Sequence, residues 1–382
     1  MKRLILVGAG HAHAQVLKKL AHTPLPNVEI LVVSPYRLAP YSGMVPGWLA
    51  GRYEFEDIAI DFEQLSKAAG ATWIKAHLHS LDPDARRLRL RVPPSDTSDD
   101  DDHDSNDDKV LTGELTQIEY DLLSLNIGST LDPPSPNMLA LRPLANLREK
   151  YEQLLLQWHQ SPSSVPDGLT VIGAGPAGVE TLLALHARLK SLNPEKNIRA
   201  TLVTRADKIL PDLNCMTRWL ACRQLEYTGV IRRCNTLWSD GMERDDELVL
   251  WATGAQAHKW QRTTDTRGAL AVSDQHFIRI DPSLRSVSHP DIFATGDCAH
   301  WPGGLPKAGV YAVRMGAVLC NNLYAVLDQG TLSNYEPQRQ FLALLNTSDG
   351  RAIASRGAFA ATGRWAMRWK DHIDRRFVQQ FR

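Results

Sequence analysis

Short apolar runs that stop at a glycine, each followed by a stretch with helical spacing, recur along this chain. Residues 4–7 (LILV) end at Gly-Ala-Gly, and a helix is predicted over 14–20. Residues 169–172 (LTVI) end at a second Gly-Ala-Gly, and a helix is predicted over 181–189. A short continuous apolar run bounded by turn residues is typical of a strand buried on both faces. The pattern therefore predicts an α/β protein with two strand–turn–helix units.

Further elements are predicted on both sides of the second unit. The predicted strands are 28–33, 72–78, 86–92, 120–129, 200–205, 247–254, 292–294 and 352–355. The remaining predicted helices are 147–158, a helix that opens at 305–311 and runs to about 327, and a basic aromatic helix that closes the chain. Segments rich in proline and glycine, 35–44, 131–136 and 161–166, are expected to be irregular.

The two glycine turns favour binding of dinucleotides. Gly8 allows a turn that a side chain would block, and Gly10 lets the backbone approach a diphosphate. The new helix then directs its free N–H groups and its positive dipole end at that anion. His13 stands where this motif has its third glycine, whereas the second unit has the complete set, at Gly173, Gly175 and Gly178. Two such units predict two nucleotides, a flavin and a nicotinamide.

The residue after each second strand selects the nucleotide. Ser34 stands where an acidic residue binds the adenosine ribose in the first unit, and Arg37 either faces a phosphate or is a solvated loop arginine. In the second unit Thr204 and Arg205 occupy the place of the acid that selects NADH, with Lys208 nearby. Cations there favour the 2′-phosphate of NADPH, although a surface arginine after a strand is common.

Composition limits the remaining classes of protein. The 382 residues suffice for two or three domains, and Lys+Arg equals Asp+Glu at 43 each, which argues against nucleic acid as a partner. No apolar run approaches the roughly 18 residues that span a bilayer, and the apolar start is too short for a signal peptide, so we expect a cytoplasmic protein. Five cysteines without C-x-x-C argue against disulfide chemistry. The acidic run at 95–109 is predicted to be a disordered loop rather than a calcium site.

Several segments carry a resemblance to a known family. They are GAGHAH at 8–13, YSGM at 41–44, ATGD at 294–297, LPKAGVYAVR at 305–314 and WKDHIDRRF at 369–377. With the two glycine turns, they resemble the two-dinucleotide-binding-domain flavoproteins of the pyridine nucleotide–disulfide oxidoreductase superfamily. Type II NADH dehydrogenases look similar, and the flavoprotein module found fused to selenophosphate synthetase looks more similar still. The resemblance implies two Rossmann-like domains: a discontinuous FAD domain over 1–142 and 274–330, and an inserted NAD(P) domain over 143–273. A C-terminal region follows over 331–382.

The resemblance also implies the residues that bind the two cofactors. FAD would be held by Gly8, Gly10, His11, Ala12, Ser34, Arg37, Tyr41, Ser42, the backbone of Leu78, Gly128, Gly296, Asp297, Lys307, Ala308, Gly309 and Val310. NAD(P)H would be held by Gly173, Gly175, Pro176, Ala177, Gly178, Glu180, Thr204, Arg205, Thr253 and Gly254. Asp297 would accept hydrogen bonds from the ribityl chain, and the helix start at 307–310 would stabilise negative charge on the reduced flavin.

Lys307 and Glu180 are the expected catalytic residues, with Glu180 near the nicotinamide. Hydride transfer from a nicotinamide to a flavin needs position and electrostatics more than a protein base, so no catalytic triad is expected. His11 and His13 invite a catalytic interpretation, but a histidine at position 13 more often packs a helix on a strand. Cys298 is expected to be a small buried residue rather than a redox thiol.

The electron acceptor is the open question. The stripe of the closing helix, at Trp365, Trp369, Ile373, Phe377 and Phe381, is flanked by basic residues. Such a helix either lies on a membrane surface, at its inner face, or packs on this protein or on a second subunit of a homodimer. We therefore expect an FAD-dependent NAD(P)H dehydrogenase that reduces a quinone or another small acceptor. The alternative is a flavoprotein partner of selenophosphate synthetase in selenium metabolism, with little turnover of its own.

Overall fold

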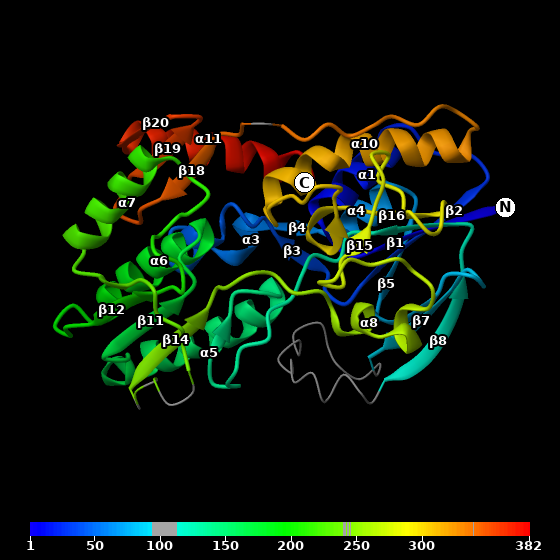
Figure 1. Cartoon of the computed structure of the whole chain (residues 1–382). Coiled ribbons are helices and arrows are strands. Elements are labelled where there is room, and N and C mark those ends of the chain that lie inside the picture. The colour runs from blue at the N-terminus through cyan, green and yellow to red at the C-terminus, as the bar shows by residue number, and fades with distance from the viewer. Residues whose placement is uncertain (94–112, 240–241, 243, 245, 339) are drawn as a thin grey trace.

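The fold of the chain, in a computed structural model, consists of two α/β units and a small C-terminal region (Figure 1). The structure describes residues 1–93, 113–239, 242, 244, 246–338 and 340–382. The expected acidic loop at 95–109 lies outside the described residues. The predicted α/β class with two parallel Rossmann-like sheets is confirmed.

The first unit is built on a five-stranded parallel sheet. Its strands, in spatial order, are β16 (Ile292–Ala294), β9 (Leu122–Leu125), β1 (Lys2–Val7), β2 (Val28–Ser34) and β5 (Thr72–Lys75). The helices of this unit are α1 (His11–His22), α4 (Phe62–Ala68) and α10 (Gly309–Leu327). Strand β1 is buried on both faces from Leu4 to Val7, which is why the sequence shows a continuous apolar run rather than an alternating one. The sheet therefore takes strands from both ends of the chain.

Shorter elements surround this sheet. They are β3 (Leu38–Pro40), β4 (Ala59–Asp61), α2 (Val45–Leu49), α3 (Phe55–Ile58), the antiparallel sheet of β6 (His77–Asp82), β7 (Arg87–Val92) and β8 (Glu114–Glu119), α8 (Lys259–Arg262), α9 (Thr264–Arg267), β15 (Ile278–Arg279), the short 3₁₀ turn η3 (Gly296–Cys298) and β17 (Ala299–His300).

The second unit repeats the same parallel plan. Its strands, in spatial order, are β10 (Leu139–Ala140), β14 (Glu247–Trp251), β11 (Gly168–Ile172), β12 (Arg199–Val203) and β13 (Ile231–Arg233). Its helices are α5 (Leu144–Gln160), α6 (Pro176–Leu192) and α7 (Cys215–Tyr227), with the 3₁₀ turn η2 (Pro162–Ser164). In each unit the glycine turn joins the central strand to its helix, so the turn lies at the carboxyl edge of the sheet.

The C-terminal region covers the second unit and then returns to the first. It comprises the antiparallel strands β18 (Ala343–Asn346), β19 (Ala352–Arg356) and β20 (Phe359–Gly363), followed by α11 (Arg364–Gln379). In Figure 1 this region lies at one end of the molecule, and α11 runs from it toward α1. Hydrogen bonds from Lys18 to Gln380 and from Arg382 to the carbonyl of Glu56 hold the chain end on the first unit.

Some local predictions are wrong, for identifiable reasons. The predicted strand 72–78 is two strands, because the chain leaves the parallel sheet after Lys75 and joins the antiparallel one at His77. The segment 35–44 contains the strand β3. Helix α7 was not predicted, since its apolar residues face both the core and solvent: Leu225 is fully buried, whereas Trp219 is half-exposed. Helix α10 is long and apolar enough to cross a bilayer, contrary to the expectation, but it packs against α1.

Candidate functional site

The first glycine turn is occupied by a neighbouring side chain. Gly8 has φ +100°, and a Cβ there would lie 2.4 Å from the carbonyl oxygen of Asn126. A Cβ at Gly10 would lie 2.0 Å from Asn126 Oδ1, and one at Gly296 would lie 2.8 Å from its Nδ2. The first and last of these glycines have a positive φ as well. In this turn, glycine is therefore required by the close approach of Asn126.

Asn126 joins the two halves of the first unit. Its Oδ1 accepts from the backbone N–H of Ala12 at 3.1 Å and of His13 at 3.4 Å, and its Nδ2 donates to the carbonyl of Thr295 at 2.9 Å. The side chain is 3% exposed, so these bonds form away from water. It satisfies two of the free N–H groups at the start of α1. Asn126 thereby fixes the strand ends on both sides of the turn.

His13 replaces the missing third glycine by making specific bonds. Its Nδ1 lies 2.7 Å from the carbonyl oxygen of Gly8, and its Nε2 lies 2.8 Å from Ser124 Oγ. The ring is fully buried, and burial lowers its pKa to about 4, so it is neutral. Nδ1 therefore donates to the carbonyl, and Ser124 donates to Nε2. The interpretation of His13 as a packing residue agrees with these contacts.

The second glycine turn is open where the first is filled. Gly173 has φ +116°, and a Cβ there would lie 2.3 Å from the carbonyl oxygen of Ala252, next to Thr253. A Cβ at Gly178 would lie 1.8 Å from the carbonyl oxygen of Gly173, which is the close helix–strand contact that the motif predicts. A Cβ at Gly175, by contrast, would meet nothing within 4 Å. Space for a ligand therefore remains in front of this turn.

The remaining residues predicted around the second turn lie near it in the chain. Pro176 and Ala177 form the exposed first turn of α6, whose N–H groups have no partner inside the helix. Thr253 and Gly254 follow β14, the strand beside β11. Thr204 and Arg205 follow β12 on the other side. The fold thus gathers the predicted NAD(P)H residues at one sheet edge.

Asp297 is bound by an arginine that the sequence analysis did not identify. Arg142 Nη1 donates to Asp297 Oδ2 at 2.6 Å and to Ser129 Oγ at 2.6 Å, and Ser129 Oγ lies 3.2 Å from the same carboxylate oxygen. Arg142 also reaches the carbonyl of Lys307 at 3.4 Å. Gly128, another predicted residue, precedes this serine and has φ +72°. The predicted ribityl-binding carboxylate is therefore held in place by a cation.

Lys307 and the residues after it form the start of α10. Lys307 Nζ donates to the carbonyl of Ala299 at 2.5 Å and lies 3.8 Å from the centroid of the Phe277 ring. Burial lowers the pKa of Lys307 to about 8. Ala308 is the N-cap, and Gly309 and Val310 begin the helix. The helix therefore begins within the predicted segment 307–310, two residues after Lys307.

Three rings pack together beside the first glycine turn. The Tyr41 and Phe377 rings lie 4.5 Å apart, and His11 lies 5.3 Å from Tyr41 and 5.8 Å from Phe377, centroid to centroid. Burial lowers the pKa of His11 to about 4, and its Nε2 is buried without a hydrogen-bond partner among the described residues. Ser42 Oγ lies 2.8 Å from where a Cβ on Gly309 would be. The predicted flavin residues 41 and 42 therefore lie between α1, α10 and α11.

Glu180 lies next to a buried ion pair. Its Oε1 accepts from the backbone N–H of Asn346 at 2.7 Å, and burial raises its pKa to about 7, against the field of Lys370. Lys370 Nζ donates to Asp374 Oδ2 at 2.8 Å and to the carbonyl of Gly43 at 2.7 Å. Both members of the pair are less than 10% exposed. These contacts bring the second unit, the turn at residue 43 and α11 together at one point.

Three predicted FAD residues are engaged elsewhere in the protein. Ser34 Oγ donates to the carbonyl of Tyr36 at 2.9 Å and is buried, so it stabilises its own turn. Arg37 pairs with Asp61 at 2.8 Å and lies 3.4 Å from Glu63, with 42% of its side chain exposed. Leu78 lies in β6 beside a register shift in its pairing with β7. Their cofactor roles stay predictions.

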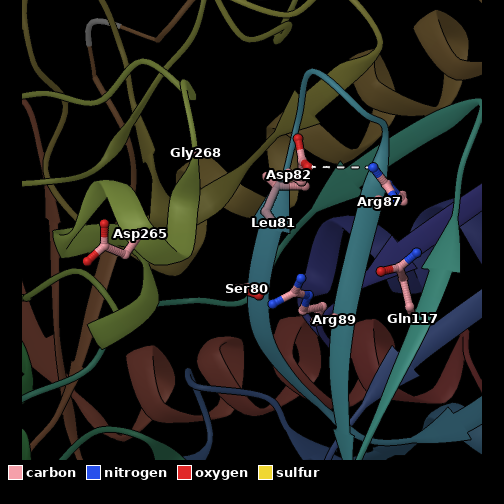
Figure 2. Close-up of a pocket in the computed structure, with 8 residues that line it drawn as sticks. All are labelled: Ser80, Leu81, Asp82, Arg87, Arg89, Gln117, Asp265 and Gly268. Carbon is pink, nitrogen blue, oxygen red and sulfur yellow. Dashed lines mark ion pairs between the residues drawn. The ribbon is translucent and has the colours of Figure 1, made fainter.

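A pocket of about 280 Å³ lies away from this site. Figure 2 shows it between β6, β7 and β8 on one side and α9 on the other, with the Arg87 and Asp82 side chains paired at its upper edge. Arg89 and Gln117 project from neighbouring strands at its floor. None of the predicted cofactor residues lines this pocket, so it is separate from the candidate site.

Sequence reasoning missed Asn126, Arg142, Lys370 and Asp374. Asn126 carried a detectable signal, since it is the first residue after β9 and so lies at the carboxyl edge where ligands bind in such sheets. Lys370 and Asp374 are four residues apart on α11, the spacing of an ion pair, but nothing local showed that this face is buried. Arg142 gave no local signal, because its partner is 155 residues away.

The residues present fit two dinucleotides. The His11 ring nitrogen is a buried polar atom in need of a partner, at the start of the helix that follows the first turn. The open space at Gly175 lies at the start of the helix that follows the second. Both positions suit a diphosphate or another polar group of a nucleotide. This arrangement, with two Rossmann-like units whose glycine turns precede helices, defines the flavin- and nicotinamide-dependent oxidoreductases.

The chain belongs to the pyridine nucleotide-disulphide oxidoreductase family, whose model matches residues 2–316. Members of this class bind FAD and NAD(P)H, as we expected here. The chain is 24% identical to the internal alternative NAD(P)H-ubiquinone oxidoreductase A1 of Arabidopsis thaliana, over 84% of this chain and 66% of that protein. It spans about two thirds or less of the length of the curated relatives it matches.

Solved structures share the fold at low identity. The sulfide:quinone oxidoreductase from Aquifex aeolicus superposes with a TM-score of 0.76 at 16% identity, covering 100% of this chain and 92% of that one. NDH2 from Plasmodium falciparum in complex with NADH superposes with a TM-score of 0.74 at 11% identity, covering 100% and 97%. At these identities the likeness concerns the fold alone.

Proposed function

We propose that this protein is an NAD(P)H dehydrogenase that passes electrons through FAD to a quinone. The observation that carries the proposal is that three parts of the chain meet at one place: Lys370 of α11 donates to the carbonyl of Gly43 in the first unit, and its charge acts on Glu180 of the second unit. The relatives that are named as NAD(P)H-ubiquinone oxidoreductases support the same acceptor class. FAD, when bound, supplies a group that accepts a hydride from the nicotinamide and returns electrons one or two at a time.

The protein's own groups position the reactants and handle protons. The Arg142–Asp297 pair and the start of α10 would orient the flavin and favour negative charge on it. Reduction of a quinone to a quinol takes up two protons. Glu180, with a pKa raised to about 7, can hold a proton at its carboxyl oxygen near neutral pH and release it. The charges of Lys370 and Asp374 act on Glu180 in opposite directions, since Lys370 lowers its pKa and Asp374 raises it.

An anaerobic titration tests the proposed function. NADH or NADPH should bleach the flavin absorbance at about 450 nm, and a short-chain ubiquinone should then restore it. E180Q should slow reoxidation by the quinone more than bleaching by the nicotinamide. Purified protein that stays colourless and takes up no FAD would refute the flavin part. Full bleaching without reoxidation by any quinone would refute the acceptor.

Sulfide chemistry is a less suitable alternative, although one structural neighbour is a sulfide:quinone oxidoreductase. Sulfide is itself the nucleophile, so its oxidation needs an electrophilic sulfur beside the flavin, such as a disulfide between two neighbouring cysteines, whereas all five cysteines here are free thiols. Cys298 lies next to Asp297, but it is fully buried, and burial raises its pKa to about 11. The thiol therefore stays protonated, which supports our interpretation of Cys298 as a small buried residue.

For the site of action, we propose peripheral contact with the inner face of the membrane through α11. Trp365, Trp369 and Ile373 are 51%, 44% and 37% exposed, whereas Phe377 and Phe381 pack against the first unit. The expected five-residue stripe is therefore divided, and its exposed half is flanked by Arg364 and Arg368. Aromatic and basic residues in this arrangement suit an anionic bilayer surface.

Co-sedimentation with phosphatidylglycerol vesicles tests this contact. Replacing Trp365 and Trp369 by serine should remove binding, and L156S, at a 61%-exposed leucine of α5, is the matched control. If the same double variant instead converts a dimer into a monomer in light scattering, the face is a homodimer contact. No change in either measurement would refute both assignments.

The partnership with selenophosphate synthetase stays an alternative that rests on the motif resemblance alone. It predicts a stable complex with the synthetase and poor bleaching of the flavin by either nicotinamide. Gel filtration of a mixture of the two proteins, run beside the anaerobic titration, separates this alternative from the dehydrogenase.

A further inference from the structure

We infer that the second unit takes NADPH in preference to NADH, and that Arg205 and Arg233 together recognise the 2′-phosphate. The inference rests on the proposed nicotinamide site and names which nucleotide that site selects. Arg205 was already a candidate from its position after a strand. Arg233 lies 28 positions further along the chain and becomes a candidate only through the sheet.

The two arginines stand at the ends of neighbouring strands, because β12 and β13 are paired in parallel. Val203 stands opposite Arg233 in the register, and the Thr204 N–H donates to the carbonyl of Arg233 at 2.9 Å. The pairing continues past the strands, where the Asn235 N–H donates to the carbonyl of Ala206 at 2.9 Å. The chain therefore carries two arginines at the same carboxyl edge of the sheet.

This edge is where the adenosine ribose of a dinucleotide comes to lie. A diphosphate bound at the Gly173 turn would lie at the end of β11, and β12 is the next strand. In dinucleotide-binding units, an acid at the end of that next strand accepts a bond from the ribose 2′-hydroxyl and repels a phosphate there. Here the position is Thr204, whose Oγ1 already accepts from the Ala206 N–H at 3.2 Å. Nothing at this position opposes a 2′-phosphate.

The charges around this edge leave these two cations available. Both are exposed, and neither forms an ion pair within the part of the chain that the structure describes. Their neighbours differ: Arg232 pairs with Glu226, and Lys208 lies 3.9 Å from Asp207. Asp207 is the nearest acid along the chain, and its charge is offset by that lysine.

The energetics favour a measurable preference. A 2′-phosphate carries close to two negative charges, and a guanidinium binds such a group through two parallel hydrogen bonds. Hydrogen bonds to charged groups contribute more to the free energy of binding than hydrogen bonds between neutral groups do. Screening at an exposed site reduces this contribution, so we expect about a tenfold effect for each arginine.

Equilibrium binding to the purified flavoprotein tests the inference without turnover. The probes are 2′,5′-ADP, which carries the extra phosphate, and 5′-AMP, which lacks it, each measured by calorimetry. We expect 2′,5′-ADP to bind at least tenfold more tightly and to weaken as salt is raised. R205Q and R233Q should each remove about tenfold of that difference, whereas R232Q, the neighbouring arginine engaged by Glu226, should remove none.

The outcomes separate this inference from the proposed function. Equal binding of the two probes, or a loss in R232Q as large as that in R233Q, would overturn the preference. If R205Q alone removes it, Arg233 is not part of the site. Tight binding of 2′,5′-ADP in a protein whose flavin no nicotinamide bleaches would support the NADPH site while refuting the dehydrogenase. Rapid bleaching by NADH, with equal binding of the two probes, would support the dehydrogenase and refute the preference for NADPH.

Discussion

Arg142 Nη1 donates to Asp297 Oδ2 at 2.6 Å, across 155 positions of the sequence. Asp297 belongs to the Gly-Asp segment that follows β16, and Arg142 precedes the first helix of the second unit. The same guanidinium reaches the carbonyl of Lys307 at the start of α10. One arginine at the junction of the two units thus positions both Asp297 and the start of α10, the two groups that we expect to contact the flavin.

Arg142→Ala should weaken retention of FAD about tenfold, because Asp297 loses the cation that orients it. The measurement is release of flavin during dialysis, with the free cofactor quantified by fluorescence. R142K should restore part of the affinity, since it returns the charge without the fork geometry. The control is R199A, at an exposed arginine that begins β12. Equal retention in wild type and R142A would contradict a role in flavin binding.

Glu180→Gln should stabilise the protein at alkaline pH. The pKa of Glu180 is raised from 4.5 to about 7 in the folded state, so the folded protein binds more protons than the unfolded one between these values. The free energy of unfolding of wild type therefore falls as the pH rises through this window. The cost of ionising the buried Glu180 carboxyl is fully present above pH 7. We expect E180Q to exceed wild type by about 3 kcal/mol at pH 8 and to match it near pH 4. Urea unfolding at both pH values measures the difference.

His13→Gln should reduce the acid sensitivity of the fold. The pKa of His13 is lowered from 6.5 to about 4, so the unfolded state binds more protons in that window. The contribution of neutral His13 to the free energy of unfolding is fully present above pH 6.5, and it is lost as the pH falls toward 4. The variant should lose about 1–3 kcal/mol at pH 8, with two buried bonds disturbed. Below pH 6.5, the free energy of unfolding of the variant should fall less steeply with pH than that of wild type, because the variant takes up about one proton fewer on unfolding. A parallel pH profile would show that His13 is not the titrating group.

Lys370→Met should destabilise the protein by about 3–5 kcal/mol, because Asp374 is left buried without its cation. Burial already raises the pKa of Asp374 against the field of this lysine. The double variant K370M/D374L should recover most of the loss, since it removes both charges and fills the space. Thermal unfolding of the two variants gives the comparison. A double variant no better than the single one would show that the carbonyl of Gly43 is the contact that matters.

Asn126→Leu should be among the most damaging single changes in the first unit, at about 3–5 kcal/mol. It leaves the N–H groups of Ala12 and His13 and the carbonyl of Thr295 without partners in a buried place. Asn126→Asp keeps the acceptor at the start of α1 and should cost less. Equal losses in the two variants would mean that packing, rather than hydrogen bonding, accounts for the effect.

The sequence was sufficient for the features that depend on neighbours in the chain. The turns at Gly8 and Gly173, the strands before them and the helices after them follow from local apolar runs and from glycine's access to positive φ. The family resemblance supplied the class of cofactors. The same reasoning explained Gly178, where a side chain would strike the carbonyl of Gly173.

Tertiary structure decided which polar groups meet. Gly10 is small to admit the side chain of Asn126, which follows β9, a strand that pairs with β1. Asn126 binds the N–H of Ala12 across 114 positions of the chain. Arg37 turned out to bind Asp61, and the stripe of α11 was divided by its contact with the first unit. Hydrophobic periodicity predicts whether a residue is buried, but it does not predict which residue forms a hydrogen bond or an ion pair with it. Hydrogen bonds and ion pairs over such separations are fixed only when the sheets bring their strand ends together.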